Sequence, residues 1–269
     1  MTLTVQLNYI TKTLNEKLYI KEGVTSNAEV KIPNAEVVNY WVKSQGSATK
    51  ANKPGTAQTF TAKALVKKSV TVDASEQLNG VIPGVNIATV SADAVNAYVI
   101  EDVIQAANNI NRDFLTKLET AAQAASTTYT DAYGSILKLA AEFKTLNKGN
   151  YTEPTAVFVD PEVYADLLKN NLIYYKDNKP ASVFPFEVIE APDLTNRVVM
   201  MNQIAMVSGI AFNAVKTFDA SPLGYADGVG YIGEIAYVNK ATEFDTSYKG
   251  KPVLAIAKAS SSGSGSSGS

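Results

Sequence analysis

The side chains in this chain that are able to do chemistry are mainly carboxylates and lysines. The sequence contains no histidine and no cysteine. It therefore offers no thiolate nucleophile, no Ser-His-Asp triad and no ordinary zinc site. The general base that enzymes use most often near neutral pH is also missing. We therefore expect a protein that is not an enzyme and has no catalytic residues.

Acidic residues are the remaining candidates for catalysis or metal binding. Glu101 and Asp102 are adjacent on a predicted helix, where neighbouring side chains point about 100° apart and act poorly on one substrate. We also considered a calcium site at Asp73, Asp227, Glu243 and Asp245. Their spacing is not that of an EF-hand loop. Both glycine-rich phosphate-binding patterns are missing from the sequence, and we expect no metal and no cofactor.

A lysine-bearing stretch without acidic residues runs from Val37 to Val72. Its six lysines are Lys43, Lys50, Lys53, Lys63, Lys67 and Lys68. Two interpretations remain open: a solvated loop, or a basic arm that lies on an acidic surface of a neighbouring subunit. In the second interpretation, Glu101 and Asp102 are the candidate acidic surface.

Two aromatic residues stand near the start of this stretch: Tyr40 and Trp41, the only tryptophan of the chain. Such a pair either packs in the core or anchors a subunit contact, because Trp and Tyr dominate interface hot spots. The candidate assembly-interface residues are Tyr40, Trp41, Lys43, Lys50, Lys53, Lys63, Lys67, Lys68, Glu101 and Asp102.

Hydrophobic periodicity predicts the elements that carry these residues. Residues 37–42 are rich in β-branched and aromatic side chains, and residues 59–72 alternate apolar and polar side chains, so both predict strands. The polar run between them predicts a loop. Together they predict a long two-stranded β-ribbon, which is marginally stable alone and needs a surface to lie on.

The segments around this ribbon differ in character. Residues 1–34 show no long helical period and predict an extended arm, and residues 73–96 predict a turn-rich connection. Residues 95–126 give the strongest helical signal, a helix about 45 Å long at 1.5 Å per residue. Its apolar positions, three or four residues apart, are Ile100, Val103, Ile104, Ala107, Ile110, Phe114, Leu118 and Ala121.

The second half of the chain mixes short helices and strands. A helix is predicted at 135–146 and a buried strand at 155–159. Asp160 followed by Pro161 predicts the start of another helix. Further strands are predicted at 183–189, 197–201, 204–207, 230–239 and 252–258. Strands that are grouped, rather than alternating strictly with helices, indicate the α+β class.

The overall composition restricts the function further. The 269 residues are 46% hydrophobic and 19% charged, with a net charge of −2, so the basic excess typical of nucleic-acid-binding proteins is missing. The first residues lack the pattern of a secretory signal, and no stretch approaches the ~20 apolar residues of a membrane span. We expect synthesis in the cytosol. Residues 260–269 have the composition of a flexible linker or an added tail.

The order of these segments resembles the Hong Kong 97-type major capsid proteins of tailed bacteriophages over residues 1–259. The ribbon opens with VKIPNAEVVNYWVKSQG and is followed by the long helix. The unit TAVFVDPEVYADLLKN, with FEVIEAPDL after it, looks like the axial domain of that family. YIGEIAYVNK and KPVLAIAKA look like the return of the chain into the peripheral domain.

The resemblance implies a fold, a domain organisation and a function. The implied fold is the α+β Hong Kong 97-type capsid fold, with an N-terminal arm, an extended β-ribbon loop, a peripheral domain with a long spine helix, and an axial domain. The implied ranges are 1–34 for the arm, 35–72 for the extended loop, 73–133 with 228–259 for the peripheral domain, 134–227 for the axial domain and 260–269 for the Ser/Gly linker or tail. The implied function is a structural major capsid protein that self-assembles into hexamers and pentamers of an icosahedral phage head enclosing double-stranded DNA.

The resemblance also implies partners and a location. The partners are other copies of the chain and packaged double-stranded DNA held without sequence specificity, with scaffolding, portal and decoration proteins as further candidates. The location is the virion, after synthesis in the host cytoplasm and without a membrane. Two alternatives remain: an encapsulin-like nanocompartment shell protein of the same fold, and a bacterial surface-layer or adhesin subunit. The missing secretion signal argues against the last.

Overall fold

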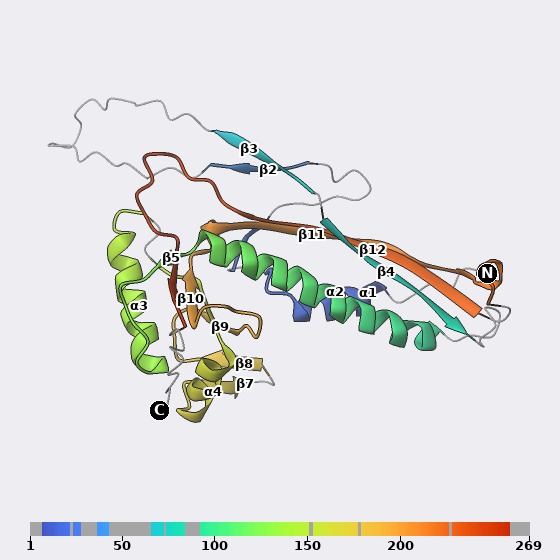
Figure 1. Ribbon diagram of the computed structural model, residues 1–269, viewed down its shortest axis with the longest axis horizontal. Helices are drawn as coiled ribbons and strands as arrows, with labels where there is room; N and C mark the ends of the chain where they lie inside the picture. The colour runs from blue at the N-terminus through green and yellow to red at the C-terminus, as the bar shows by residue number, and fades with distance from the viewer. Residues whose placement is uncertain are drawn as a thin grey trace, which may run out of the picture. The chain divides into compact units, whose positions relative to one another are not determined.

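The computed structural model describes residues 7–21, 24–27, 37–42, 66–72, 74–83, 92–150, 153–176, 179–225 and 228–258 (Figure 1). Helices and strands are mixed, as expected for the α+β class. The chain divides into two compact units. Unit 1 contains residues 1–118 and 203–249, and unit 2 contains residues 119–202 and 250–269.

Unit 1 is built on a four-stranded sheet in the order β1-β11-β12-β4. The strands are β1 (Ser26–Asn27), β4 (Ala74–Pro83), β11 (Met206–Asp219) and β12 (Gly228–Ala241). The long strands β11 and β12 pair antiparallel, with a register irregularity between Asn213 and Lys216. The pairing of β12 with β4 is antiparallel and unbroken from Gly228 opposite Pro83 to Tyr237 opposite Ala74.

The predicted long helix is α2 (Ala92–Ala121), which runs along this sheet (Figure 1). Its buried stripe has the predicted three- and four-residue spacing and includes Val103, Ala107 and Ile110, each 0% exposed. The stripe packs with the sheet residues Leu78, Ile82, Val229, Tyr231, Ile235 and Tyr237 in one core cluster. The long amphipathic helix is therefore confirmed, and it buries one face of the sheet.

The expected extended arm is wrong for residues 7–17, which form helix α1 (Leu7–Lys17). Leu14 and Leu18, four residues apart, are buried in the core cluster that contains α2. Asn111 of α2 fixes the end of α1, because its Nδ2 donates to the Lys17 carbonyl at 2.8 Å. Its Oδ1 accepts from the Tyr19 amide at 2.9 Å. The periodicity of α1 covers only three turns, too few to stand out in the sequence.

The expected turn-rich connection is also wrong where the structure has β4. Alternate residues of this strand face α2, with Leu78 and Ile82 buried. The other row is polar, which weakens the sequence signal for a strand. Gly80 lies within this segment and is needed for packing: a Cβ there would lie 2.5 Å from the Tyr231 hydroxyl oxygen.

The base of the predicted ribbon is present as β2 (Val37–Trp41) and β3 (Lys67–Thr71). They pair antiparallel, from Val37 opposite Thr71 to Trp41 opposite Lys67. The rest of the predicted ribbon, residues 43–65, lies outside the described residues.

Unit 2 is built on a five-stranded sheet in the order β5-β13-β10-β6-β9. The strands are β5 (Gln123–Ala124), β6 (Ala156–Val159), β9 (Glu187–Glu190), β10 (Val198–Met201) and β13 (Val253–Ile256). Every residue of β6, β10 and β13 is buried. Helices α3 (Ala132–Leu146) and α4 (Pro161–Lys169) share one core cluster with this sheet. The hairpin of β7 (Ile173–Lys176) and β8 (Lys179–Ser182) was not predicted.

The helix start predicted at Asp160 and Pro161 is confirmed. The Asp160 carboxylate accepts a hydrogen bond from the Val163 amide at 2.9 Å, and Pro161 occupies the first turn of α4. The same carboxylate binds Arg197 Nη1 at 3.2 Å and lies 3.8 Å from Lys258 Nζ. The Asp160 side chain is 3% exposed, so it is a buried acceptor that ties α4 to two basic residues of unit 2.

The two compact units differ from the expected domain ranges in three segments. Residues 119–133 were assigned with 73–133, but they belong to unit 2. Residues 203–227 were assigned with 134–227, but most of them form the two 3-10 turns Gln203–Ala205 and Ser221–Leu223 and strand β11, which pairs with β12 in unit 1. Residues 250–259 were assigned with 228–259, but β13 pairs with β10 in unit 2. The strands β12 and β13 therefore belong to different sheets.

Candidate functional site

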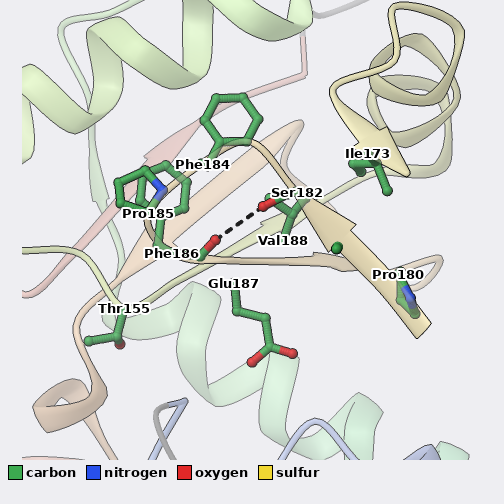
Figure 2. A pocket seen from close by; sticks show the side chains of 10 residues that line it. Thr155, Ile173, Pro180, Ser182, Phe184, Pro185, Phe186, Glu187 and Val188 are labelled. Carbon is green, nitrogen blue, oxygen red and sulfur yellow. Dashed lines mark hydrogen bonds between the residues drawn. The ribbon is translucent and has the colours of Figure 1, made fainter. Parts of the chain in front are cut away.

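A hollow lies in unit 2, between the β7–β8 hairpin and β9 (Figure 2). It has a volume of about 520 Å³ and is lined by Phe184 and Phe186, whose rings stack at 5.4 Å. Of the ten lining residues only Glu187 carries a charge. Ser182 Oγ donates to the Phe186 carbonyl at 3.5 Å. A single carboxylate without a second acid or base in the lining does not form a catalytic site.

The described residues also contain no cluster of three or more acidic side chains that could hold a metal ion. Within the same residues, no helix is both long and apolar enough to cross a membrane. The sequence-predicted interface residues belong to unit 1, and the surfaces that carry them are the candidate functional sites.

Tyr40 lies at the base of the ribbon and is 8% exposed. With Val70 it packs against Val207 of β11 and Val238 of β12. Because Tyr237 faces the α2 cluster and strand residues alternate, Val238 is on the opposite face of the sheet. Burial raises the pKa of Tyr40, and the Glu243 carboxylate raises it further. Tyr40 thus attaches the ribbon base to its own subunit.

Lys68 lies opposite Tyr40 in the ribbon, and its side chain also extends to Glu243. Its Nζ lies 3.2 Å from Glu243 Oε2, and Lys240 Nζ lies 3.5 Å from the other carboxylate oxygen. The Lys68 hydrogen bond and charge, with a smaller effect of Lys240, lower the pKa of Glu243. Lys68 therefore has an acidic partner within its own chain. Its neighbour Lys67 is exposed and points to the other face of the ribbon.

Glu101 and Asp102 have different environments, as their separation on a helix predicts. The Tyr231 hydroxyl donates to Asp102 Oδ2 at 2.7 Å. Burial and this Asp102 contact raise the pKa of Tyr231. Asp102 thus joins α2 to β12 inside unit 1, while Glu101 is exposed one position earlier on α2.

The remaining candidate residues lie partly outside the described part of the chain. Lys43, Lys50, Lys53 and Lys63 fall outside it, and for Trp41 only the backbone, in β2, is described. In unit 1 the structure brings together Tyr40 and Lys68, whereas Asp102 contacts the opposite face of the sheet.

Sequence reasoning missed an apolar surface on the outer face of the unit 1 sheet, the face opposite α2. Phe218 is 37% exposed and Ile232 53% exposed. Phe218 pairs with Gly230 across the strands, and both residues, like Ile232, point to this outer face. The Phe218 ring lies on Gly230, because a Cβ atom on Gly230 would be only 2.2 Å from that ring. The side chains of Tyr225 and Val81 likewise lie close to Gly228 on this face. We call Val81, Phe218, Tyr225 and Ile232 the outer apolar patch. Recognising β11 as a long strand would have revealed it.

No protein-family model matches the chain, and no curated protein matches it. Solved structures do match. The capsid of Cyanophage P-SCSP1u is 13% identical with a TM-score of 0.58, over 89% of this chain and 88% of that chain. The mature capsid of bacteriophage PhiM1 is 13% identical with a TM-score of 0.52, over 88% and 86%.

A third match is a virus-like particle from Pyrococcus furiosus, 9% identical with a TM-score of 0.55, over 93% of this chain and 96% of that chain. At such low identity the comparisons establish the fold alone. The chain has the fold of phage capsid proteins, and the resemblance predicted from the order of its segments is confirmed at that level.

Proposed function

We propose that this chain is the structural subunit of a phage capsid, a protein that works by self-assembly and not by catalysis. The observation that carries the proposal is the end-to-end fold match, because the phage capsid structures named above share 86% or more of their length with this chain. The chemistry agrees, since histidine and cysteine are missing from the sequence.

In the finer form of the proposal, the subunits form hexamers and pentamers that close into an icosahedral shell around double-stranded DNA. The outer apolar patch supports association, because exposed apolar clusters on a folded subunit mark interaction surfaces. A net charge of −2 suits a shell that encloses DNA without gripping its phosphates. The subunit is made in the host cytoplasm and ends in the virion, and scaffolding, portal and decoration proteins are its further partners.

The proposed assembly interface uses the ribbon lysines and the exposed acid of α2. Lys68 and Asp102 already have partners in their own subunit. The proposal therefore rests on Lys67 and Glu101, both exposed, together with Trp41, Lys43, Lys50, Lys53 and Lys63. Exchanging Lys63 and Lys67 for Glu, with Lys68 retained, should block assembly and leave the subunit folded. Normal shells from that double variant would refute this interface.

The experiment that tests the proposed function is negative-stain electron microscopy of the purified full chain, alone and with its scaffold if one is found beside its gene. Closed shells, or rings and tubes of repeating capsomers, are expected. A protein that stays monomeric at every salt and protein concentration, with scaffold present, would contradict the proposal.

A second candidate is the shell of a cellular nanocompartment, which uses the same fold. The match to the virus-like particle from Pyrococcus furiosus, over 96% of that chain, favours it. The contents of purified shells separate the two candidates. Nuclease-resistant double-stranded DNA supports the phage head, and a co-purifying cargo protein without DNA supports the nanocompartment.

A further inference from the structure

The hollow in unit 2 is formed where the chain turns from β8 into β9 (Figure 2). The start of β9 is fixed by the sheet, because the Glu187 amide donates to the Thr155 carbonyl at 3.1 Å. The beginning of the turn is fixed on the hairpin, because the Val183 amide donates to the Leu172 carbonyl at 3.0 Å. Both ends of the turn are therefore held by backbone hydrogen bonds. The volume of about 520 Å³ lies in the range of sites that bind small molecules.

Apolar and aromatic side chains make up most of the walls of this hollow. Phe184 and Phe186 are 8% and 7% exposed, and their stacked rings are 14° from parallel. The centre of the Tyr133 ring, on α3, lies 5.9 Å from that of Phe184. Figure 2 shows the two phenylalanines on one side of the hollow and Pro180 on the other. The walls thus offer packed aromatic rings, beside which a flat ligand or a cation is stabilised.

The polar groups of the lining are few and carry one sign of charge. Glu187 is the one charged residue among the ten that line the hollow, so none of these ten is basic. A carboxylate beside apolar walls attracts a cation more strongly than it would in open water, because the local dielectric constant is lower. An anionic ligand would be repelled, and a purely apolar ligand would leave the carboxylate against hydrocarbon. The lining therefore favours a ligand with one positive charge and a flat apolar body.

We propose that this hollow binds a small organic cation, a protonated amine on an aromatic or apolar ring system. The ring lies against Phe184 and Phe186, and the ammonium group donates to the Glu187 carboxylate. A hollow enclosed by one turn of a single chain suits a free small molecule, whereas a protein partner needs a broader surface. The inference goes beyond the proposed self-assembly and does not depend on it, because every lining residue belongs to unit 2 of one subunit.

The test compares three probes that share an indole ring and differ in charge. Tryptamine is the cation, tryptophol is its neutral counterpart and indole-3-propionate is the anion. Titration of each probe with the purified full-length subunit, followed by ligand-observed NMR, should give tryptamine an affinity about tenfold higher than tryptophol, which corresponds to about 1.4 kcal/mol. Indole-3-propionate should bind more weakly than both. Equal affinities for tryptamine and tryptophol, or no binding of tryptamine, would overturn the inference.

Two glutamate variants locate the charge that is responsible. Glu187→Gln keeps the size of the side chain and removes its charge, so tryptamine should bind this variant only as weakly as tryptophol does. The matched control is Glu190→Gln, which removes an exposed carboxylate from the same strand but outside the lining. The control should bind tryptamine like the wild type, and thermal unfolding checks that both variants are folded. Equal losses of affinity in the two variants would assign the effect to overall charge and refute the site.

A third variant tests the hollow independently of Glu187. Ala181 lines the hollow and is partly exposed, so Ala181→Trp adds an indole ring there while the carboxylate remains. This variant should weaken the binding of tryptamine and of tryptophol alike. Unchanged binding of both probes by a folded Ala181→Trp protein would show that they bind elsewhere, and the inference would be wrong while the proposed function stands.

Discussion

The two sheets of this protein differ in how much of their surface they bury within the subunit. In unit 2, every residue of β6, β10 and β13 is buried. In unit 1, α2 covers one face of the sheet, the ribbon base covers part of the other, and Phe218 and Ile232 stay exposed. We call the unit 2 sheet, whose three central strands are fully buried, the complete sheet, and the unit 1 sheet, which keeps an exposed apolar face among the described residues, the incomplete sheet. In a protein that self-assembles, the incomplete sheet is where a partner adds burial.

The largest effect should come from breaking the complete sheet's core. Leu139 of α3 is 0% exposed and packs on the unit 2 sheet. Leu139→Ala should lower the free energy of unfolding by about 2–5 kcal/mol, from lost burial and the cavity left behind. Leu137→Ala on the same helix, where the side chain is 43% exposed, is the control and should cost far less. Urea denaturation of both variants measures the difference, and equal losses would contradict the assigned burial.

The packed face of the incomplete sheet should respond next. In Gly80→Ala, the new Cβ meets the Tyr231 ring and hydroxyl at 2.5–2.8 Å, and overpacking of this kind costs about 1–3 kcal/mol. Ser75→Ala, on the exposed row of the same strand, should change stability by less than about 0.5 kcal/mol. Thermal unfolding of the two variants is the measurement. A Gly80→Ala protein as stable as the wild type would show that Tyr231 lies elsewhere.

The exposed face of the incomplete sheet should affect assembly and not folding. Ile232→Lys removes an apolar side chain that is 53% exposed, so the free energy of unfolding should change by less than about 0.5 kcal/mol. Shell formation, followed by light scattering, should weaken because the outer apolar patch acquires a charge. If the Ile232→Lys subunit were destabilised but assembled normally, this face would serve folding and not assembly, and the prediction would be wrong.

The smallest effect concerns the ribbon base that covers part of this face. The pKa of Glu243 is lowered by Lys68, so the ion pair contributes stability above the ordinary glutamate pKa of about 4.3 and loses it as pH falls through the lowered value. Fluorescence of Trp41, the only tryptophan, follows the ribbon during such a titration. The wild type should show a small acid transition that Glu243→Gln lacks. The same transition in both proteins would assign it to another group.

Sequence reasoning succeeded where the signal was local. The apolar stripe of α2 repeats over many turns, and the cap at Asp160 depends on residues within one turn, so both were predicted. The strand β4 was missed because one of its rows is polar and Gly80 is explained only by Tyr231, far away in the chain. Helix α1 was missed because its three turns are too short to show a clear period.

The contacts of the candidate interface residues within the subunit could not be predicted, for the same reason. The two strands at the base of the predicted ribbon were identified correctly, but the partners of their residues are distant in sequence. Asp102 pairs with a tyrosine 129 residues further along the chain, and Lys68 pairs with Glu243. Composition and periodicity carry no information on such pairs, so two residues expected at an interface turned out to hold their own subunit together.

The interleaving of the two units along the chain has a consequence for protein synthesis. The middle of the unit 2 sheet needs β13, which is translated only after β11 and β12 of unit 1. At about 5–20 residues per second, ribosomes reach Val253 roughly 3–10 s after Met201. During that interval β10 waits without one of its two neighbours, so unit 2 becomes complete only when both units have been made. A nascent chain is thus kept from acting as a finished building block until nearly all of the described fold has left the ribosome.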